Sequence, residues 1–267
     1  MSMDVGKSDG KTSISTADES SVCIRGLDLC HDLMGKMRFS AFFCFLLTGK
    51  KPTEDQEFFL DATLLSIAEH GLTPNVQASR MTYAAEPDCL QAAVAAGILG
   101  CGSVVLGTAE IVGNLLKQGI NKAAETGLSY AQTAEMLVKK FRDEKRKLPG
   151  FGHPLHKPVD PRCERLLQLA DERGVAGQHV AFVRALGKAA DREYQRPMVM
   201  NVSAAIPAVL RDLEFPSAAM KGIPILARTA GLLANLLEES QRPIGFRLAY
   251  LAGKEIEYDG PKLLPGR

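Results

Sequence analysis

The sequence predicts an all-α protein. Helix-start signals recur along the 267-residue chain, and alternating β-branched residues are confined to residues 13–24, where they weakly indicate a small hairpin. A chain of this length can bury a sizeable core, in one large domain or in two smaller ones. The fold class therefore depends on the helices.

Two capping boxes place two of these helices. The first capping box pairs Thr53 with Gln56, each side chain accepting the backbone N–H of the other residue. It begins an amphipathic helix that reaches about Glu69. Ser129 and Gln132 form the second pattern, which opens a helix that ends in a basic run. Both starts are local signals, so they predict helices whatever the rest of the chain does.

Proline and glycine bound a third helix. Asp160 followed by Pro161 is typical of an N-cap and a first helical residue, and Gly174 is a stop signal. The segment 88–102 is rich in alanine and glycine and apolar nearly all round, so we expect it to be a buried helix. The other expected helices cover residues 108–117, 177–194 and 220–240.

Composition excludes several classes of protein. The net charge is +1 with both signs interleaved, so we expect no nucleic-acid surface. The first twenty residues are polar, so we expect no targeting signal there, and the apolar run 40–47 is too short to cross a bilayer. The cysteines show neither a CxxC pair nor metal-ligand spacing, which favours reduced thiols in a cytoplasmic protein without a metal. They are Cys23, Cys30, Cys44, Cys89, Cys101 and Cys163.

The segment 148–162 is the strongest indication of chemistry, and it reads Leu-Pro-Gly-Phe-Gly-His-Pro-Leu-His-Lys-Pro-Val-Asp-Pro-Arg. Two glycines flank Phe151, which would let the backbone approach a ligand closely. His153 follows and can donate or accept near neutral pH. Arg162 falls in the first helical turn, beside backbone N–H groups that favour anions. The combination suits a carbonyl compound that bears a carboxylate.

The other histidines have two interpretations each. We interpret His31 and the mid-helix His179 as structural. His156 is either a second site histidine or part of a surface turn, which Lys157 and Pro158 favour. His70 is either a ligand-binding group or a cation that offsets the dipole at the end of its helix.

Two further arginines could bind an anionic substrate. Arg228 lies on an apolar helix, where an unpaired charge would cost several kcal/mol, so it needs a ligand or an acid such as Glu238 or Glu239. Arg242 precedes a proline in a turn, where a solvated charge is the alternative. Forked guanidinium groups of this kind could together bind two or three carboxylates.

Gly-Phe-Gly-His-Pro followed by Asp-Pro-Arg resembles the signature of the citrate synthase superfamily. The wider pattern, from about Ile14 to about Glu255, is most similar to the citryl-CoA lyases and the C-terminal module of ATP-citrate lyase. The other matching segments follow the family's order and approximate spacing: Glu69-His70-Gly71, Gly100-Cys101-Gly102-Ser103, Gly107, Met200-Asn201-Val202, Ala227-Arg228-Thr229-Ala230-Gly231 and Arg242-Pro243.

The resemblance implies a citrate-synthase-like helical fold. Residues 1–107 and 210–267 would form a large domain, and residues 108–209 a smaller domain that carries His153 and Arg162 and closes over the site. The protein would work as a homodimer or a higher homo-oligomer.

The resemblance also assigns roles to residues. His70 would contact the oxaloacetate half of the substrate, and His153 would bind its carbonyl or hydroxyl oxygen and take or share the hydroxyl proton. Arg162 and Arg228 would bind carboxylates, and Arg242 would reach in from a neighbouring subunit. The loop near coenzyme A would comprise Pro149, Gly150, Phe151 and Gly152.

The implied activity is cleavage of citryl-CoA to acetyl-CoA and oxaloacetate, with the CoA thioester as substrate and no permanently bound cofactor. Two alternatives stay open: condensation of acetyl-CoA with oxaloacetate, as in citrate or methylcitrate synthases, and an impaired relative that only binds an acyl-CoA or a tricarboxylate. Ser203 stands where the family has a catalytic aspartate, and Val105 where citrate synthases have a histidine that lyase-type members also lack. Without a phosphate-loop signature, a separate synthetase would have to activate citrate.

Overall fold

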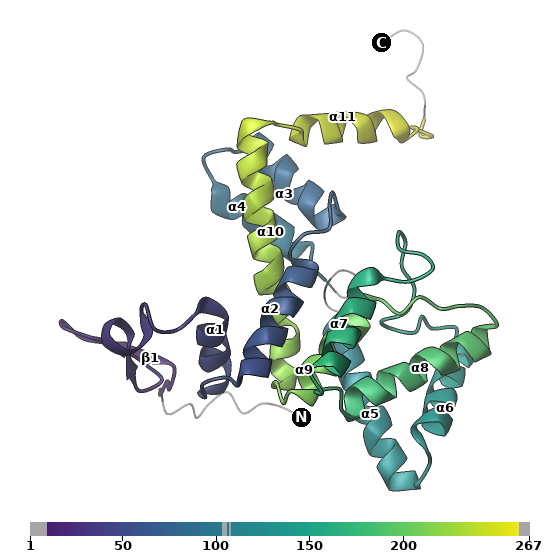
Figure 1. Cartoon of the computed structure of the whole chain (residues 1–267). Coiled ribbons are helices and arrows are strands. Elements are labelled where there is room, and N and C mark those ends of the chain that lie inside the picture. The colour runs from purple at the N-terminus through teal and green to yellow at the C-terminus, as the bar shows by residue number, and fades with distance from the viewer. Residues whose placement is uncertain (1–9, 103–105, 107, 262–267) are drawn as a thin grey trace. The chain divides into compact units, whose positions relative to one another are not determined.

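The computed structural model describes residues 10–102, 106 and 108–261, and these are mostly helical, as predicted (Figure 1). None of the helices in these ranges is long and apolar enough to cross a membrane. The strands are β1 (Ser15–Ala17), β2 (Val22–Ile24) and β3 (Leu27–Asp28), followed by a π-helical turn, η1 (Leu29–Leu33). The helices are α1 (Phe39–Thr48), α2 (Glu54–Ala68), α3 (Pro74–Ala85), α4 (Leu90–Leu99), α5 (Thr108–Thr126), α6 (Tyr130–Asp143), α7 (Pro161–Glu172), α8 (Gln178–Tyr194), α9 (Val202–Asp212), the 3-10 helix η2 (Ser217–Met220), α10 (Gly222–Gln241) and α11 (Gly245–Glu255).

The chain forms two compact units. Unit 1 comprises the described residues of Met1–Thr63 and Val112–Met220, and unit 2 those of Leu64–Ile111 and Lys221–Arg267. The residues up to Thr63 group with the segment that carries His153. The domain bounds that the resemblance implies stay a prediction.

In unit 1 the helices α7 and α8 both pack on α9. Residues 204–210 of α9 are all buried, so this helix is enclosed on every side. Helix α6 packs on α8, where the rings of Tyr130 and Phe182 meet edge to face with centroids 5.4 Å apart. The small sheet in the same unit is an antiparallel meander in the order β1-β2-β3, which extends the hairpin that the sequence weakly indicates.

The expected helix starts are present. Thr53 and Gln56 exchange hydrogen bonds at the start of α2, and Ser129 and Gln132 do so at the start of α6. Four helices were not expected: α1, α3, α9 and α11. The residues before α1, α3 and α11 make no side-chain capping hydrogen bond, so their starts lack the usual local signal.

In unit 2 a buried ion pair joins three helices. Arg80 on α3 is 3% exposed, and its Nε donates to Glu239 on α10 at 2.7 Å. Its Nη1 donates to Glu238 at 2.9 Å. Glu239 also accepts the backbone N–H groups of Ile244 at 2.8 Å and Gly245 at 2.6 Å, so it caps the start of α11. Arg80 and Glu239 thereby fix the turn between α10 and α11.

The expectation that residues 88–102 form a buried helix is wrong in part. Ala93 and Gly97 of α4 are buried, but Leu99 is 86% exposed. An apolar groove of about 450 Å³ lies along α4 and α10, lined by Leu90, Gln91, Val94, Ala95, Ile98 and Leu233. Unit 2 therefore presents an apolar surface, which an alanine- and glycine-rich sequence does not reveal.

Candidate active site

The glycine loop before His153 is attached to the start of α9. The N–H of Gly152 donates to the carbonyl of Val199 at 2.6 Å, and the N–H of Asn201 donates to the carbonyl of Gly150 at 3.0 Å. The Asn201 side chain donates to the carbonyl of Gly152 at 2.9 Å and accepts the N–H of Ser203 at 3.0 Å. One asparagine thus fixes the loop and caps the helix.

The two glycines of this loop meet different structural requirements. Gly150 has φ +82°, and a Cβ there would lie 2.9 Å from Ala204 Cβ and from Val112 Cγ2. Gly152 has φ +90°, but a Cβ there would meet nothing within 4 Å. Gly150 therefore permits close packing inside the protein, a reason that the sequence did not disclose. The contact of Pro149, Gly150, Phe151 and Gly152 with coenzyme A stays a prediction.

Asp160 connects the starts of α7 and α9. Its buried carboxylate accepts from Arg162 through Nε at 3.0 Å and Nη2 at 2.9 Å, and from the N–H of Val202 at 3.0 Å. Burial acts to raise the pKa of Asp160, but the hydrogen bonds from Arg162 and Val202 outweigh it and hold that pKa below its usual value. Asp160 was expected only as an N-cap.

Arg162 is consequently paired before any ligand binds. Asp160 also accepts its backbone N–H at 3.1 Å, as the predicted N-cap does. The Arg162 side chain is 20% exposed, and its Nη1 group makes no hydrogen bond to the described residues. Arg162 can therefore orient a carboxylate through Nη1, with its charge already offset by Asp160.

The tautomer of His153 follows from its neighbours. Its Nδ1 accepts the backbone N–H of Leu155 at 3.1 Å and that of His156 at 2.9 Å. Two N–H groups directed at Nδ1 favour the neutral tautomer that carries its proton on Nε2, and in that tautomer the contact of Nε2 with Arg162 is not a hydrogen bond, because a guanidinium group only donates. Nε2 lies 3.4 Å from Arg162 Nη2. In this tautomer His153 presents an N–H donor beside a guanidinium group.

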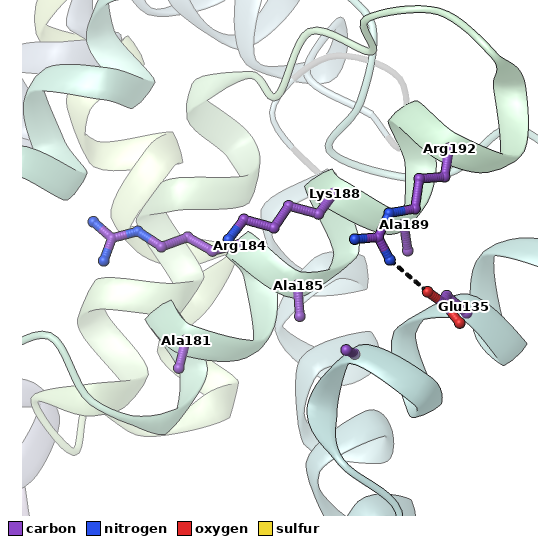
Figure 2. Close-up of a pocket in the computed structure, with 8 residues that line it drawn as sticks. Glu135, Ala181, Arg184, Ala185, Lys188, Ala189 and Arg192 are labelled. Atoms are coloured by element: carbon purple, nitrogen blue, oxygen red, sulfur yellow. Dashed lines mark hydrogen bonds and ion pairs between the residues drawn. The ribbon is translucent and has the colours of Figure 1, made fainter.

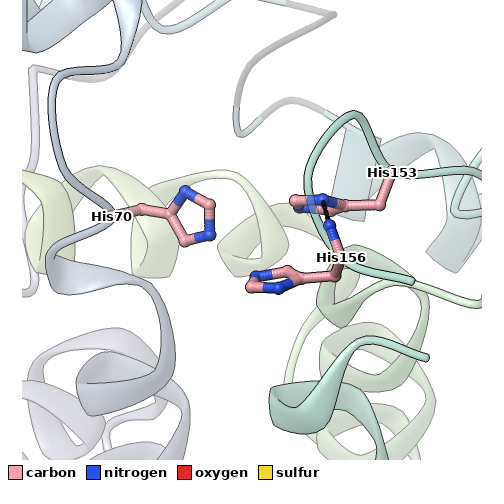
Figure 3. Close-up of side chains that lie close together, drawn as sticks. All are labelled: His70, His153 and His156. Carbon is pink, nitrogen blue, oxygen red and sulfur yellow. Dashed lines mark hydrogen bonds between the residues drawn. The ribbon is translucent and has the colours of Figure 1, made fainter. Parts of the chain in front are cut away.

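His156 lies in a surface turn, as Lys157 and Pro158 indicate, and its side chain contacts His153. Its side chain is half-buried, and its ring lies against that of His153 with centroids 4.3 Å apart and an interplanar angle of 32° (Figure 3). The signal in the sequence was Pro154, which favours a tight turn and brings the next residues back toward His153.

Ser203 is the second residue of α9 and is half-buried. Its hydroxyl makes no hydrogen bond to any residue that the structure describes. Asp160 reaches the start of α9, but its oxygens are occupied and its pKa is lowered, so it is a poor group for proton transfer. That Ser203 stands where the family has a catalytic aspartate stays a prediction.

The predicted site residues His70 and Arg228 lie in unit 2. His70 is half-buried and follows the end of α2 at Ala68, in a turn where Glu69 accepts the N–H of His70 at 3.0 Å and that of Gly71 at 2.6 Å. His70 therefore lies beyond the helix rather than within its last turn.

Arg228 is 4% exposed on α10. The expected alternative pairing with Glu238 or Glu239 is wrong, because those carboxylates bind Arg80. Burial raises the pKa of the Cys101 thiol, and the positive charge of Arg228 opposes that rise. Arg228 therefore lies close to the Gly-Cys-Gly segment that carries part of the resemblance.

Close packing brings α10 to the end of α2. A Cβ on Gly231 would collide with the carbonyl oxygen of Ala68, so only glycine permits this approach. The Asn235 side chain donates to Glu69 at 2.7 Å, one turn further along α10. These contacts attach the segment that carries His70 to the helix that carries Arg228.

Arg242 follows α10 with its side chain 82% exposed and 3.9 Å from Glu238. Its reach into a neighbouring subunit stays a prediction. Val105 lies outside the described residues, as do Ser103 and Gly107. Unit 1 therefore brings together His153, Arg162 and the start of α9, and unit 2 carries His70 and Arg228. Convergence of both sets on one ligand stays a prediction.

His179 is structural, as predicted. Its Nδ1 lies 2.8 Å from Asp212, which also accepts the N–H groups of Gly177, His179 and Val180 at the start of α8. Burial acts to raise the pKa of Asp212, and these hydrogen bonds outweigh it and lower that pKa. All six cysteines are free, and burial raises the pKa of Cys163 to about 12, which makes that thiol unreactive.

A hollow in unit 1 is poorly suited to an anionic ligand. It has a volume of about 360 Å³ between α6 and α8, with alanines along its floor and Arg184, Lys188 and Arg192 beside it (Figure 2). Arg192 donates to Glu135 at 2.7 Å, and Arg184 binds Asp171. Two of these three cations are therefore already neutralised.

Comparison with known proteins places this geometry in a family. The sequence matches the family described as "Citrate synthase, C-terminal domain" over residues 10–247. The citrate/2-methylcitrate synthase of Bacillus subtilis (strain 168) is 28% identical over 234 residues, which are 85% of this chain and 57% of that protein. The chain thus spans about half the length of the curated relatives it matches.

Solved structures agree on the fold. Citryl-CoA lyase from Hydrogenobacter thermophilus superposes with a TM-score of 0.82 and 30% identity, covering 96% of this chain and 97% of that one. ATP citrate lyase from Methanothrix soehngenii, solved with citrate and coenzyme A, superposes with a TM-score of 0.77 and 20% identity, covering 96% and 42%. Together these matches show that the chain belongs to the citrate synthase family.

Proposed function

We propose that this protein cleaves citryl-CoA to acetyl-CoA and oxaloacetate. The observation that carries the proposal is the donor pair on unit 1, the Nε2–H of His153 beside the guanidinium group of Arg162. Such a pair suits a substrate oxygen next to a carboxylate. The likeness to a citryl-CoA lyase at 30% identity supports the cleavage direction.

In the cleavage, the bond between the hydroxyl-bearing carbon and the thioester methylene breaks. Its electron pair passes to the thioester enolate, while the hydroxyl loses its proton and becomes the ketone of oxaloacetate. His153 already carries its proton on Nε2, so in this proposal it donates to the substrate oxygen and stabilises the negative charge there. The hydroxyl proton leaves to solvent, and a proton from solvent completes acetyl-CoA.

The remaining residues bind and orient. Arg162 and Arg228 would each hold a carboxylate, His70 would contact the oxaloacetate half, and Arg242 would come from a neighbouring subunit. The thioester would lie near the loop Pro149–Gly152, and coenzyme A would enter and leave as part of substrate and product rather than as a resident cofactor. A separate synthetase would supply the activated citrate.

Condensation of acetyl-CoA with oxaloacetate is the second candidate, because the curated relatives are named citrate synthases. The same donors would polarise the ketone in that direction. The third candidate, a binding protein of low activity, is favoured by Ser203, since a hydroxyl without a neighbouring base removes protons poorly.

We also propose that the chain works as a homo-oligomer. The apolar groove along α4 and α10, together with the exposed Leu99 and Leu237, supports a second copy as its occupant, because exposed apolar surface of this kind is typical of interfaces. Light scattering should give at least a dimer, and Leu233→Lys should shift the protein to a monomer.

The decisive experiment supplies purified protein with citryl-CoA and measures oxaloacetate with a coupled dehydrogenase. Release of oxaloacetate supports the lyase. Rapid thiol release from acetyl-CoA and oxaloacetate, without citryl-CoA cleavage, would replace the proposal with a synthase. Neither reaction, with citrate and coenzyme A binding retained in calorimetry, would replace it with a binding protein.

A further inference from the structure

We infer that His156 is a positioning residue that holds the imidazole of His153 in its working orientation. The inference rests on the proposed function for its kinetic consequences, but its structural core is independent of that function. It concerns the turn His153–His156 alone, where a backbone group and a side chain of the same residue act on one ring.

The backbone of the turn sets the tautomer. Pro154 has no N–H, so the first amides available after His153 are those of Leu155 and His156, and both donate to its Nδ1, at 3.1 and 2.9 Å. This arrangement depends on the turn and not on the side chain at position 156. Any L-residue with a free N–H could supply the second donor.

The side chain of His156 sets the ring plane. The two rings are 4.3 Å apart between centroids with a tilt of 32°, and both side chains are half-buried (Figure 3). Rotation about the last side-chain torsion of a histidine is intrinsically broad and nearly two-fold, and the hydrogen bonds to Nδ1 restrain it. A second ring against its face restrains the same rotation further.

Rocking would misdirect the proton of Nε2. Nε2 lies 3.4 Å from Arg162 Nη2, and Arg162 is itself fixed by Asp160. The donor N–H of His153 and the Nη1 group of Arg162 can bind the same substrate only if the imidazole plane and the guanidinium plane are both fixed. His156 therefore does for His153 what Asp160 does for Arg162.

The experiment separates the two contributions of position 156. His156→Ala keeps the backbone donor and removes the ring, whereas His156→Phe keeps both a donor and a flat ring. Leu155→Ala is the matched control, because Leu155 also donates its N–H to His153 but its side chain is 72% exposed.

We expect nitrogen-15 NMR of histidine-labelled protein to show His153 with its proton on Nε2 in all four proteins. The chemical shifts of the carbon-bound protons of the His153 ring should change in His156→Ala, because the ring current of the neighbouring ring is lost. In His156→Phe an aromatic ring is retained, so these protons should still show a ring-current shift. Citryl-CoA cleavage should fall about three- to tenfold in His156→Ala, mainly in kcat, and should recover in His156→Phe.

The outcomes are distinguishable from failure of the proposed function. If the wild-type protein catalyses neither reaction, the NMR comparison still tests the contact. Unchanged His153 ring signals in His156→Ala would overturn the inference, as would an unchanged kcat in a wild-type enzyme that is active. An equal loss in Leu155→Ala would also overturn it, by assigning the effect to the stability of the turn.

Discussion

Asp160 binds Arg162 through both of its carboxylate oxygens and binds the first amide of α9 with one of them. A buried carboxylate with these partners cannot be protonated or replaced without freeing the guanidinium group. The orientation of a proposed substrate-binding arginine thus depends on a buried carboxylate.

Asp160→Asn should release Arg162 and loosen the start of α9. An amide retains the volume of the carboxylate but loses one acceptor and the charge, which leaves the half-buried Arg162 without its counter-ion. We expect a loss of about 3 kcal/mol in the free energy of unfolding and at least tenfold weaker oxaloacetate binding, measured by urea titration and calorimetry. Asp171→Asn, which removes an exposed partner of Arg184, should cost less than about 1 kcal/mol. Equal effects of the two variants would contradict this role.

Acid should destabilise unit 1 through the same carboxylate. The folded-state pKa of Asp160 lies below the ordinary value of 3.8, so the unfolded chain binds more protons as the pH falls. The stability that Asp160 contributes is therefore complete well above pH 3.8 and is lost as the pH falls below it toward the lower folded-state pKa. Asp212 behaves in the same direction.

Urea unfolding at a series of pH values measures this effect. The difference in stability between wild type and Asp160→Asn should be largest near neutral pH and should shrink below pH 3.8. A difference that stayed constant down to the acid limit would mean that ionisation of Asp160 does not stabilise the fold.

Gly150→Ala should be more damaging than Gly152→Ala. Both glycines have positive φ, so each alanine bears a backbone cost of about 1 kcal/mol. At position 150 the new methyl group also meets Ala204 and Val112 at 2.9 Å, which adds about 1–3 kcal/mol of overpacking. Thermal unfolding of the two variants isolates the packing contribution, and equal melting temperatures would be evidence against the close approach of the loop to α9.

Arg80→Met should strongly destabilise unit 2. Methionine fills part of the space but leaves Glu239 buried and without its cation, which typically costs about 3–5 kcal/mol. Chemical unfolding should show this loss, and the exposed pair of Arg142 and Glu193 supplies a control, because Arg142→Met should change stability by less than about 1 kcal/mol. A mild effect of Arg80→Met would mean that water reaches Glu239.

Local signals predicted much of this protein, and long-range contacts did not. The starts of α2, α6 and α7 are each predicted by a capping residue and a partner no more than three positions away. Helix α9 was missed because it is buried on every side, so its apolar residues show no helical period.

The site shows the same division. His153 and Arg162 were recognised from one short segment, and their separation in space is 3.4 Å between Nε2 and Nη2. The hydrogen bond from the N–H of Val202 to Asp160 joins residues 42 positions apart, and no sequence pattern near either residue predicts it. The place of His156 against His153 depends on the path of a turn, which Pro154 suggests but does not determine.

Ser203→Asp tests the prediction that Ser203 stands at the family's proton-transfer position. Ser203 is the second residue of α9, where an acidic side chain interacts favourably with the helix dipole, so the variant should fold. A carboxylate can remove or return a proton that a lone hydroxyl cannot, and a positioned base contributes about a hundredfold or more. We expect the rate of citryl-CoA cleavage to rise about a hundredfold in Ser203→Asp. The rate should stay near wild type in Ser203→Asn, because asparagine has the size of aspartate but is not a base. A folded Ser203→Asp with no gain would mean that another acid already transfers this proton, and Asp160 is a poor candidate because its carboxylate is paired with Arg162.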